Sequence, residues 1–91
     1  MLYMVVESFK RGPQPVYERA AERGRLLPEG LTFVDSWVDA RLDRCFQLME
    51  ADDERLLDEW TARWSDLAEF EVVPVLTSAE ASARVLGERP G

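Results

Sequence analysis

The stretch from Leu31 to Glu50 limits most strongly what this chain can fold into. Its first part, Leu31–Asp39, is rich in aromatic and β-branched residues, and Arg44–Glu50 is a more mixed run of similar character. Residues of these types suit a pleated, half-buried surface and therefore favour β-strands. The connection between the two runs, residues 40–43, has the usual length of a hairpin loop. The sequence therefore predicts an antiparallel hairpin here.

The register of this hairpin decides which side chains share a face, because successive residues of a strand point to opposite sides. We expect Trp37 to lie opposite Gln47, and Asp35 to lie opposite Met49. This pairing gathers on one face Phe33, Asp35, Trp37, Cys45, Gln47 and Met49. It gathers on the other face Val34, Ser36, Val38, Phe46 and Leu48. The second face is the drier one, and we expect helices to cover it.

One strand is expected before the hairpin and one after it. The first spans Leu2–Ser8 and alternates between two faces. The last spans Phe70–Leu76 and contains Pro74. Because proline cannot donate to a backbone ladder, this last strand is expected at the edge of its sheet.

Helical signals occupy the segments between the strands. A helix is predicted from Pro15 to about Arg23, where Gly24 is expected to end it. Asp52 or Asp53 is predicted to cap a second helix, since acidic side chains are favourable at the positive end of a helix. Its apolar stripe follows helical spacing and consists of Leu56, Trp60, Trp64 and Leu67.

A capping box formed by Thr77 and Glu80 predicts a short terminal helix from Ser78 to about Leu86. The order of elements is then βαββαβ followed by this helix, which is the ferredoxin-like pattern of the α+β class. In that topology the first and third strands are central, and both crossover helices cover the same sheet face. We expect a single domain over residues 1–91.

The sheet face opposite the helices has a composition that predicts a partner. Leu2, Met4 and Val6 are expected to face the helices. Their neighbours Tyr3, Val5 and Glu7 would then lie on the bare face, together with the hairpin residues Phe33, Asp35, Trp37, Cys45, Gln47 and Met49. That face is too apolar and aromatic to remain in water. We therefore expect a homodimer that packs through it.

Several segments resemble a known family. The opening MLYMVVESFK, the segment AERGRLLPEGL, and above all DSWVDARLDRCFQLMEADD with DEWTARWSDLAEFEVVPV look like an uncharacterised bacterial family, domain of unknown function 3303. The similarity covers nearly the whole chain, and the family has no assigned reaction to carry over. More distantly, the expected architecture is similar to dimeric α+β barrel proteins, which include cofactor-independent monooxygenases and isomerases. That second likeness implies a fold and not a function.

The charge and the residues that are missing exclude several functions. Eighteen acidic side chains against 11 basic ones give a net charge of −7, which argues against nucleic acid and against anionic membrane surfaces. The chain contains no histidine, so catalytic triads and histidine-ligated metals or haem are excluded. The acidic residues 52–59 fit a solvated helix start better than a divalent metal site. We expect no metal and no cofactor.

The cysteine content and the apolar segments point to the cytoplasm. Cys45 is the single cysteine, so no internal disulfide is possible and a reducing compartment is indicated. The apolar run Met1–Val6 is too short for a signal peptide, and no stretch approaches the length of a membrane span.

Two places are candidates for a ligand site. On the bare face, Tyr3, Glu7, Trp37 and Gln47 would set a few polar groups among aromatic rings, as small-molecule pockets do. Asp35 is the candidate general base there, because Phe33 and Trp37 would flank it on the same face. The same residues would equally suit a dimer interface.

The competing site lies between the helices and the sheet and uses Trp60 or Trp64, a pair whose spacing also suits a packed core. Three functional hypotheses follow from these features. The first is a homodimeric domain that binds a small, partly apolar molecule or serves as an accessory interaction domain. The second is a cofactor-independent oxygenase or isomerase, and the third is a structural dimerisation module.

Overall fold

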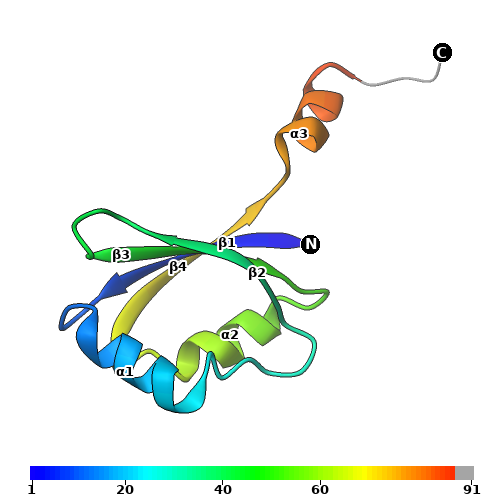
Figure 1. The fold of residues 1–91 in the computed structure, drawn as a ribbon. Coiled ribbons are helices and arrows are strands. Elements are labelled where there is room, and N and C mark those ends of the chain that lie inside the picture. Colours follow the sequence, from blue (N-terminus) through cyan, green and yellow to red (C-terminus); the bar gives the residue numbers. More distant parts are fainter. Residues whose placement is uncertain (88–91) are drawn as a thin grey trace.

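The computed structural model describes residues 1–87. Its four strands form one antiparallel sheet and comprise β1 (Leu2–Phe9), β2 (Thr32–Val38), β3 (Arg44–Glu50) and β4 (Ala68–Val75). The strand order is β2-β3-β1-β4. The helices are α1 (Gln14–Arg23), α2 (Arg55–Ala62) and α3 (Ser78–Val85). Figure 1 shows α1 and α2 on the same side of the sheet. The expected ferredoxin-like α+β fold is therefore confirmed.

The strand order also confirms the position predicted for Pro74. β4 is an edge strand whose only partner is β1, and Pro74 lies opposite Tyr3 in that pairing. The missing N–H of the proline is therefore tolerated at the open edge of the sheet. Among residues 1–87, no helix is both long and apolar enough to cross a membrane.

The end of α1 and the start of α3 follow the local signals. Gly24 has a φ of 69° and donates its N–H to the Ala20 carbonyl at 2.8 Å, which ends α1 as predicted. The second helix differs from the prediction at both ends: it is capped at Glu54 without a side-chain hydrogen bond, and it ends at Ala62, so Trp64 and Leu67 of the predicted stripe lie beyond it. The Asp53 carboxylate accepts the Arg55 N–H at 2.9 Å. Thr77 and Glu80 form the predicted capping box of α3 in both directions.

The predicted hairpin register is wrong by one residue from Asp35 onward and by two residues before it. Phe33 lies opposite Met49, but Asp35 lies opposite Leu48 and Trp37 lies opposite Phe46. A β-bulge between Phe33 and Asp35 inserts one unpaired residue, and this reverses the direction of every side chain that follows it. The predicted pairs Trp37–Gln47 and Asp35–Met49 do not form.

The choice of the helix-covered face is also wrong. Tyr3, Val5 and Glu7 of β1 are buried, whereas Leu2, Met4 and Val6 are only partly covered. The buried apolar cluster lies between the sheet and α2 and contains Tyr3, Val5, Leu31, Met49, Ala51, Leu57, Trp60 and Trp64. The helices therefore cover the face that the sequence interpretation left bare.

The opposite face, here called the open face, remains without a covering layer in this chain. Pairing brings together two rows of side chains across the strands, Trp37–Phe46–Val6–Glu71 and Asp35–Leu48–Met4–Val73. Leu2 and Val75 extend the apolar part of this surface at one end. The Trp37 side chain is 51% exposed.

Candidate functional site

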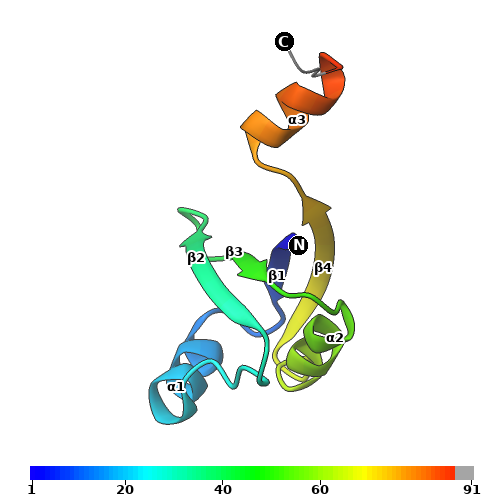
Figure 2. The ribbon, with the colours of Figure 1, turned by 90° about the vertical axis from the view of Figure 1, so that its right-hand side faces the viewer.

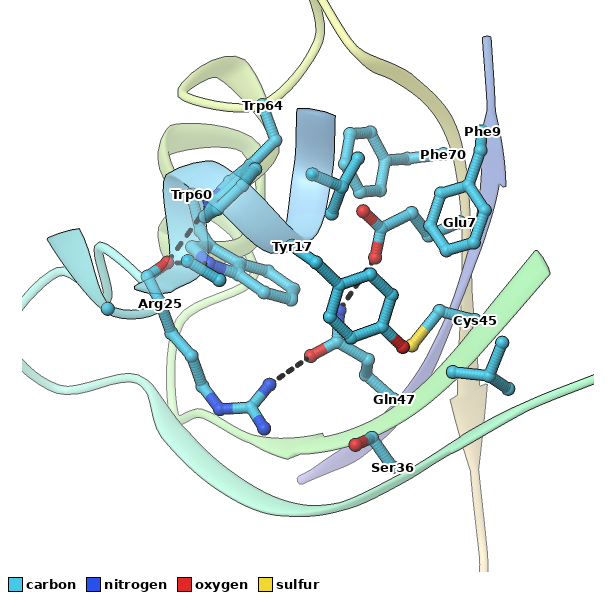
Figure 3. A pocket seen from close by; sticks show the side chains of 14 residues that line it. Glu7, Phe9, Tyr17, Arg25, Ser36, Cys45, Gln47, Trp60, Trp64 and Phe70 are labelled. Atoms are coloured by element: carbon cyan, nitrogen blue, oxygen red, sulfur yellow. Dashed lines mark hydrogen bonds between the residues drawn. The ribbon is translucent and has the colours of Figure 1, made fainter. Parts of the chain in front are cut away.

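A cavity of about 340 Å³ lies between the sheet and the two covering helices (Figure 3). It falls within the range of volumes that small-molecule sites occupy. Aromatic side chains form much of its wall and comprise Phe9, Tyr17, Trp60, Trp64 and Phe70. The polar side chains that reach it belong to Glu7, Arg25, Ser36, Cys45 and Gln47. A few polar groups therefore converge inside an aromatic enclosure.

Three of these polar side chains form a hydrogen-bonded chain. Arg25 Nη1 donates to Gln47 Oε1 at 2.9 Å, and Gln47 Nε2 donates to Glu7 Oε1 at 2.8 Å. Figure 3 shows this relay running from Arg25, through Gln47, to Glu7 on β1. Because Arg25 can only donate, its bond fixes the Gln47 amide so that its NH₂ group points at Glu7.

Glu7 is the most unusual member of the relay. Its side chain is only 3% exposed, yet among residues 1–87 it has no cationic hydrogen-bond partner. Burial raises the pKa of the Glu7 carboxyl above its ordinary value, and the Gln47 hydrogen bond and the nearby Arg25 charge oppose that rise. Within the described chain, Gln47 bonds to Oε1 and no group bonds to Oε2. One carboxyl oxygen therefore remains available to a ligand.

Arg25 is held in place through its own backbone. The indole N–H groups of Trp60 and Trp64 both donate to the Arg25 carbonyl oxygen, at 2.9 and 3.0 Å. Arg63 donates to the next carbonyl, that of Leu26, at 2.7 Å. Leu26 has a φ of 59°, a left-handed conformation that costs an ordinary residue roughly 1 kcal/mol or more. These three donors hold the loop in that conformation.

The Arg25 side chain lies at the mouth of the cavity. Its Cζ is 3.5 Å from the centroid of the Phe33 ring, which is a close cation–π contact. Within residues 1–87, Arg25 forms no salt bridge, and Gln47 is the only hydrogen-bond partner of its guanidinium. Guanidinium donors are therefore left for an anionic ligand group.

Cys45 is a thiol rather than a thiolate in this environment. Burial, followed by the nearby charge of Glu7, raises the pKa of Cys45 to about 11. An activated nucleophile needs the opposite shift. Cys45 therefore forms part of the cavity wall as a small, weakly polar side chain.

The structure divides the residues predicted from sequence into three groups. Glu7, Gln47, Trp60 and Trp64 come together in the cavity, which is the competing location between helices and sheet. Tyr3 belongs to the neighbouring packed core and does not line the cavity. The remaining two, Asp35 and Trp37, lie on the open face.

The premise that favoured Asp35 as a base is wrong. Phe33 and Trp37 do not flank it on one face, because the bulge places Phe33 on the helix-covered side. The Asp35 side chain is exposed, and its Oδ1 accepts the Ser36 N–H at 2.7 Å. A catalytic role for Asp35 stays a prediction without the apolar surroundings that motivated it.

The sequence interpretation missed Arg25, Tyr17, Phe9, Ser36 and Phe70. Arg25 follows the helix stop at Gly24, but the direction of its side chain depends on the left-handed Leu26 and on two tryptophans far along the chain. A usable signal was present for Glu7, Cys45 and Gln47. Strand alternation places these three side chains on one face of the sheet, and that shared face was the available signal.

The acidic segment at the start of α2 contains no metal-binding constellation. Asp53 forms a salt bridge to Arg55 at 2.9 Å. Within residues 1–87 there is no cluster of three or more histidine, cysteine or acidic side chains suited to a metal ion. The cavity offers one buried carboxyl, one guanidinium and an amide that links them, a set suited to binding or to proton transfer.

Comparison with known proteins identifies a family but no characterised relative. The family described as Domain of unknown function (DUF3303) matches residues 1–88. No curated protein and no solved structure matches the chain.

Proposed function

The chain belongs to the family Domain of unknown function (DUF3303), whose membership does not determine a function, and we propose that it binds a small, partly apolar acid in the cavity between helices and sheet. The observation that carries this proposal is Glu7, a buried carboxyl with one oxygen free inside an aromatic enclosure. Burying such a group without a cation costs free energy. A ligand donor at that oxygen offsets the cost.

Arg25 supports the acidic character of the ligand. Its guanidinium sits at the cavity mouth beside Phe33 and retains donors beyond the one used by Gln47. A carboxylate or a similar planar anion matches this arrangement, since guanidinium groups bind such anions with two parallel hydrogen bonds. The aromatic walls suit a ring or a compact alkyl body. The cavity volume also favours a binder over a purely structural dimerisation module.

Fluorescence of Trp60 and Trp64 provides a direct test. The chain has three tryptophans, so Trp37→Phe leaves only the two in the cavity wall. In that background we expect 3-(4-hydroxyphenyl)propanoate, whose hydroxyl can donate to Glu7 and whose carboxylate can accept from Arg25, to change the tryptophan emission in a saturable manner, and the neutral amide of the same acid to bind about tenfold more weakly or worse.

The matched control uses two arginines. Arg25→Gln should reduce the affinity for 3-(4-hydroxyphenyl)propanoate by about tenfold or more, since it removes a charge-assisted contact. Arg23→Gln removes the same charge from the exposed end of α1, outside the cavity, and should leave the affinity unchanged. Equal affinities in the two variants, across a panel of phenyl and alkyl carboxylates, would contradict the proposal.

A second candidate is a cofactor-independent enzyme, such as an oxygenase or isomerase, with Glu7 as its base. The raised pKa of Glu7 favours this candidate because a general base works best when its pKa lies near the working pH. Turnover that survives Asp35→Asn but is lost in Glu7→Gln would support it.

We propose that the protein is cytoplasmic, because its single Cys45 is a free thiol, as is usual in a reducing compartment.

A further inference from the structure

The terminal helix α3 stands away from the rest of its own chain. Figures 1 and 2 both show it at the opposite end of the molecule from α1 and α2, joined only through the end of β4. None of its residues is buried. Val85 is 82% exposed and Leu86, which follows the helix, is 74% exposed. Among residues 1–87 the helix therefore has no packing surface of its own.

This isolation conflicts with the physics of short helices. An isolated helix of this length is marginal in water, because nucleation costs more than the few hydrogen bonds return. Yet the capping box of Thr77 and Glu80 specifies where it begins. Its charged side chains, Glu80 and Arg84, are one helical turn apart and share one side. The remaining surface carries Ala79, Ala83 and Leu86 without a charge.

The link to β4 directs α3 away from its own sheet. Only Leu76 and Thr77 separate the two elements, and Thr77 is extended, with φ −66° and ψ 158°. A short, extended link directs the helix outward from the end of the strand. In Figure 1 the helix lies on the side of the sheet opposite α1 and α2, which is the side of the open face.

The open face is the second surface that lacks a partner. Trp37, Phe46, Val6, Leu48, Met4 and Val73 form two adjoining rows on it, with acidic residues at the margins. An apolar patch with a polar rim is typical of a protein interface. One chain therefore presents two unpartnered apolar surfaces on the same side.

We propose that two copies of this chain stack through their open faces and that α3 of each copy packs against the other copy. A two-fold axis lets one contact occur twice, so both surfaces of both chains are covered without a further partner. The helix acts as an arm that reaches past its own sheet.

The areas involved fit a stable dimer. Four strands spaced about 4.8 Å apart, with about eight residues each at roughly 3.3 Å per residue, present about 500 Å² per face. Stacking two faces covers about 1,000 Å², and two α3 helices bring the total toward the roughly 1,200–2,000 Å² of stable interfaces. The faces alone would fall short, and the arm supplies the difference.

Sedimentation velocity of the full-length protein tests the arrangement. We expect a dimer at micromolar concentration. The dimer should tighten as salt is added, because the chain carries a net charge of −7 and salt screens the repulsion between copies. A monomer across the accessible concentration range would overturn the proposal.

Leu86→Asp tests the arm itself. Leu86 is 74% exposed in a single copy, so an acid there is harmless to the isolated fold. In the proposed dimer it would be buried twice, and we expect dimerisation to weaken by about a hundredfold or more. Arg84→Gln is the matched control: it makes the net charge more negative by the same unit on the charged side of α3 and should weaken the dimer by less than about threefold.

Trp37→Asp separates the two parts of the interface. It should also produce monomers, and a retained circular dichroism spectrum shows that the exposed site was changed without unfolding. If Trp37→Asp dissociates the dimer while Leu86→Asp does not, the arm is not part of the interface and the proposal fails.

Discussion

The two indole N–H groups that converge on the Arg25 carbonyl predict a non-additive loss of stability. Trp60 and Trp64 are 2% and 5% exposed, and each donates to the same oxygen. A carbonyl oxygen has two lone pairs, so either tryptophan alone keeps it satisfied. The Arg25 carbonyl should become an orphan acceptor only when both donors are removed.

The expected magnitudes follow from these contacts. Trp60→Phe or Trp64→Phe removes one hydrogen bond, worth about 1 kcal/mol, and part of a buried ring, worth about 1–2 kcal/mol. Each single change should therefore lower the free energy of unfolding by about 2–3 kcal/mol. The double variant should lose a further 1–3 kcal/mol or so beyond the sum, because the carbonyl is left unpaired.

Urea unfolding followed by far-ultraviolet circular dichroism measures this cycle. The double variant comes close to the whole stability of a small domain, so trimethylamine N-oxide should be present throughout. A control cycle pairs Trp60→Phe with Phe70→Leu, whose rings are 6.4 Å apart but share no acceptor. A tryptophan cycle that is additive within about 0.5 kcal/mol would refute the shared-acceptor argument.

Two further predictions concern the cavity. Burial raises the pKa of Glu7 above its ordinary value of 4.5, so between that value and the raised pKa the folded state binds more protons than the unfolded state. The contribution of Glu7 to the free energy of unfolding therefore falls as the pH rises through this interval. Glu7→Gln should therefore be more stable than the parent at about pH 7, and the difference should shrink toward about pH 4. Thermal unfolding at several pH values measures this difference, and Glu18→Gln, at an exposed position, is the control. With its pKa raised to about 11, Cys45 should react with iodoacetamide far more slowly in the folded protein than in urea, and its rate should rise about tenfold per pH unit. Rapid alkylation of the folded protein near neutral pH would contradict that assignment.

Local signals predicted most of the architecture. The limits of β3 agree with the predicted Arg44–Glu50, and Pro74 correctly placed β4 at a sheet edge. The capping box at Thr77 and the stop at Gly24 mark real helix ends. Each of these features acts over a few residues, through one backbone conformation or one hydrogen bond. Their physical cause is therefore contained in the sequence that shows it.

The candidate site was only partly predictable. Glu7, Gln47, Trp60 and Trp64 were recognised, but they were divided between two competing locations. Hydropathy selected the wrong face for the helices because polar groups on the covered face satisfy one another, as the relay from Arg25 through Gln47 to Glu7 shows. A face can therefore contain a carboxyl and still be buried.

By itself, the sequence determined the order of elements, the edge position of β4, the end of α1 and the start of α3, because short-range sterics and hydrogen bonding set them. Only the tertiary structure decided which sheet face the helices cover and where Arg25 points. One unpaired residue near Val34 reverses the rest of β2, and no local pattern reveals such a bulge. Arg25 is positioned by Trp60 and Trp64, which lie 35 and 39 residues further along the chain. Contacts across such separations form only when the whole sheet and both helices are in place.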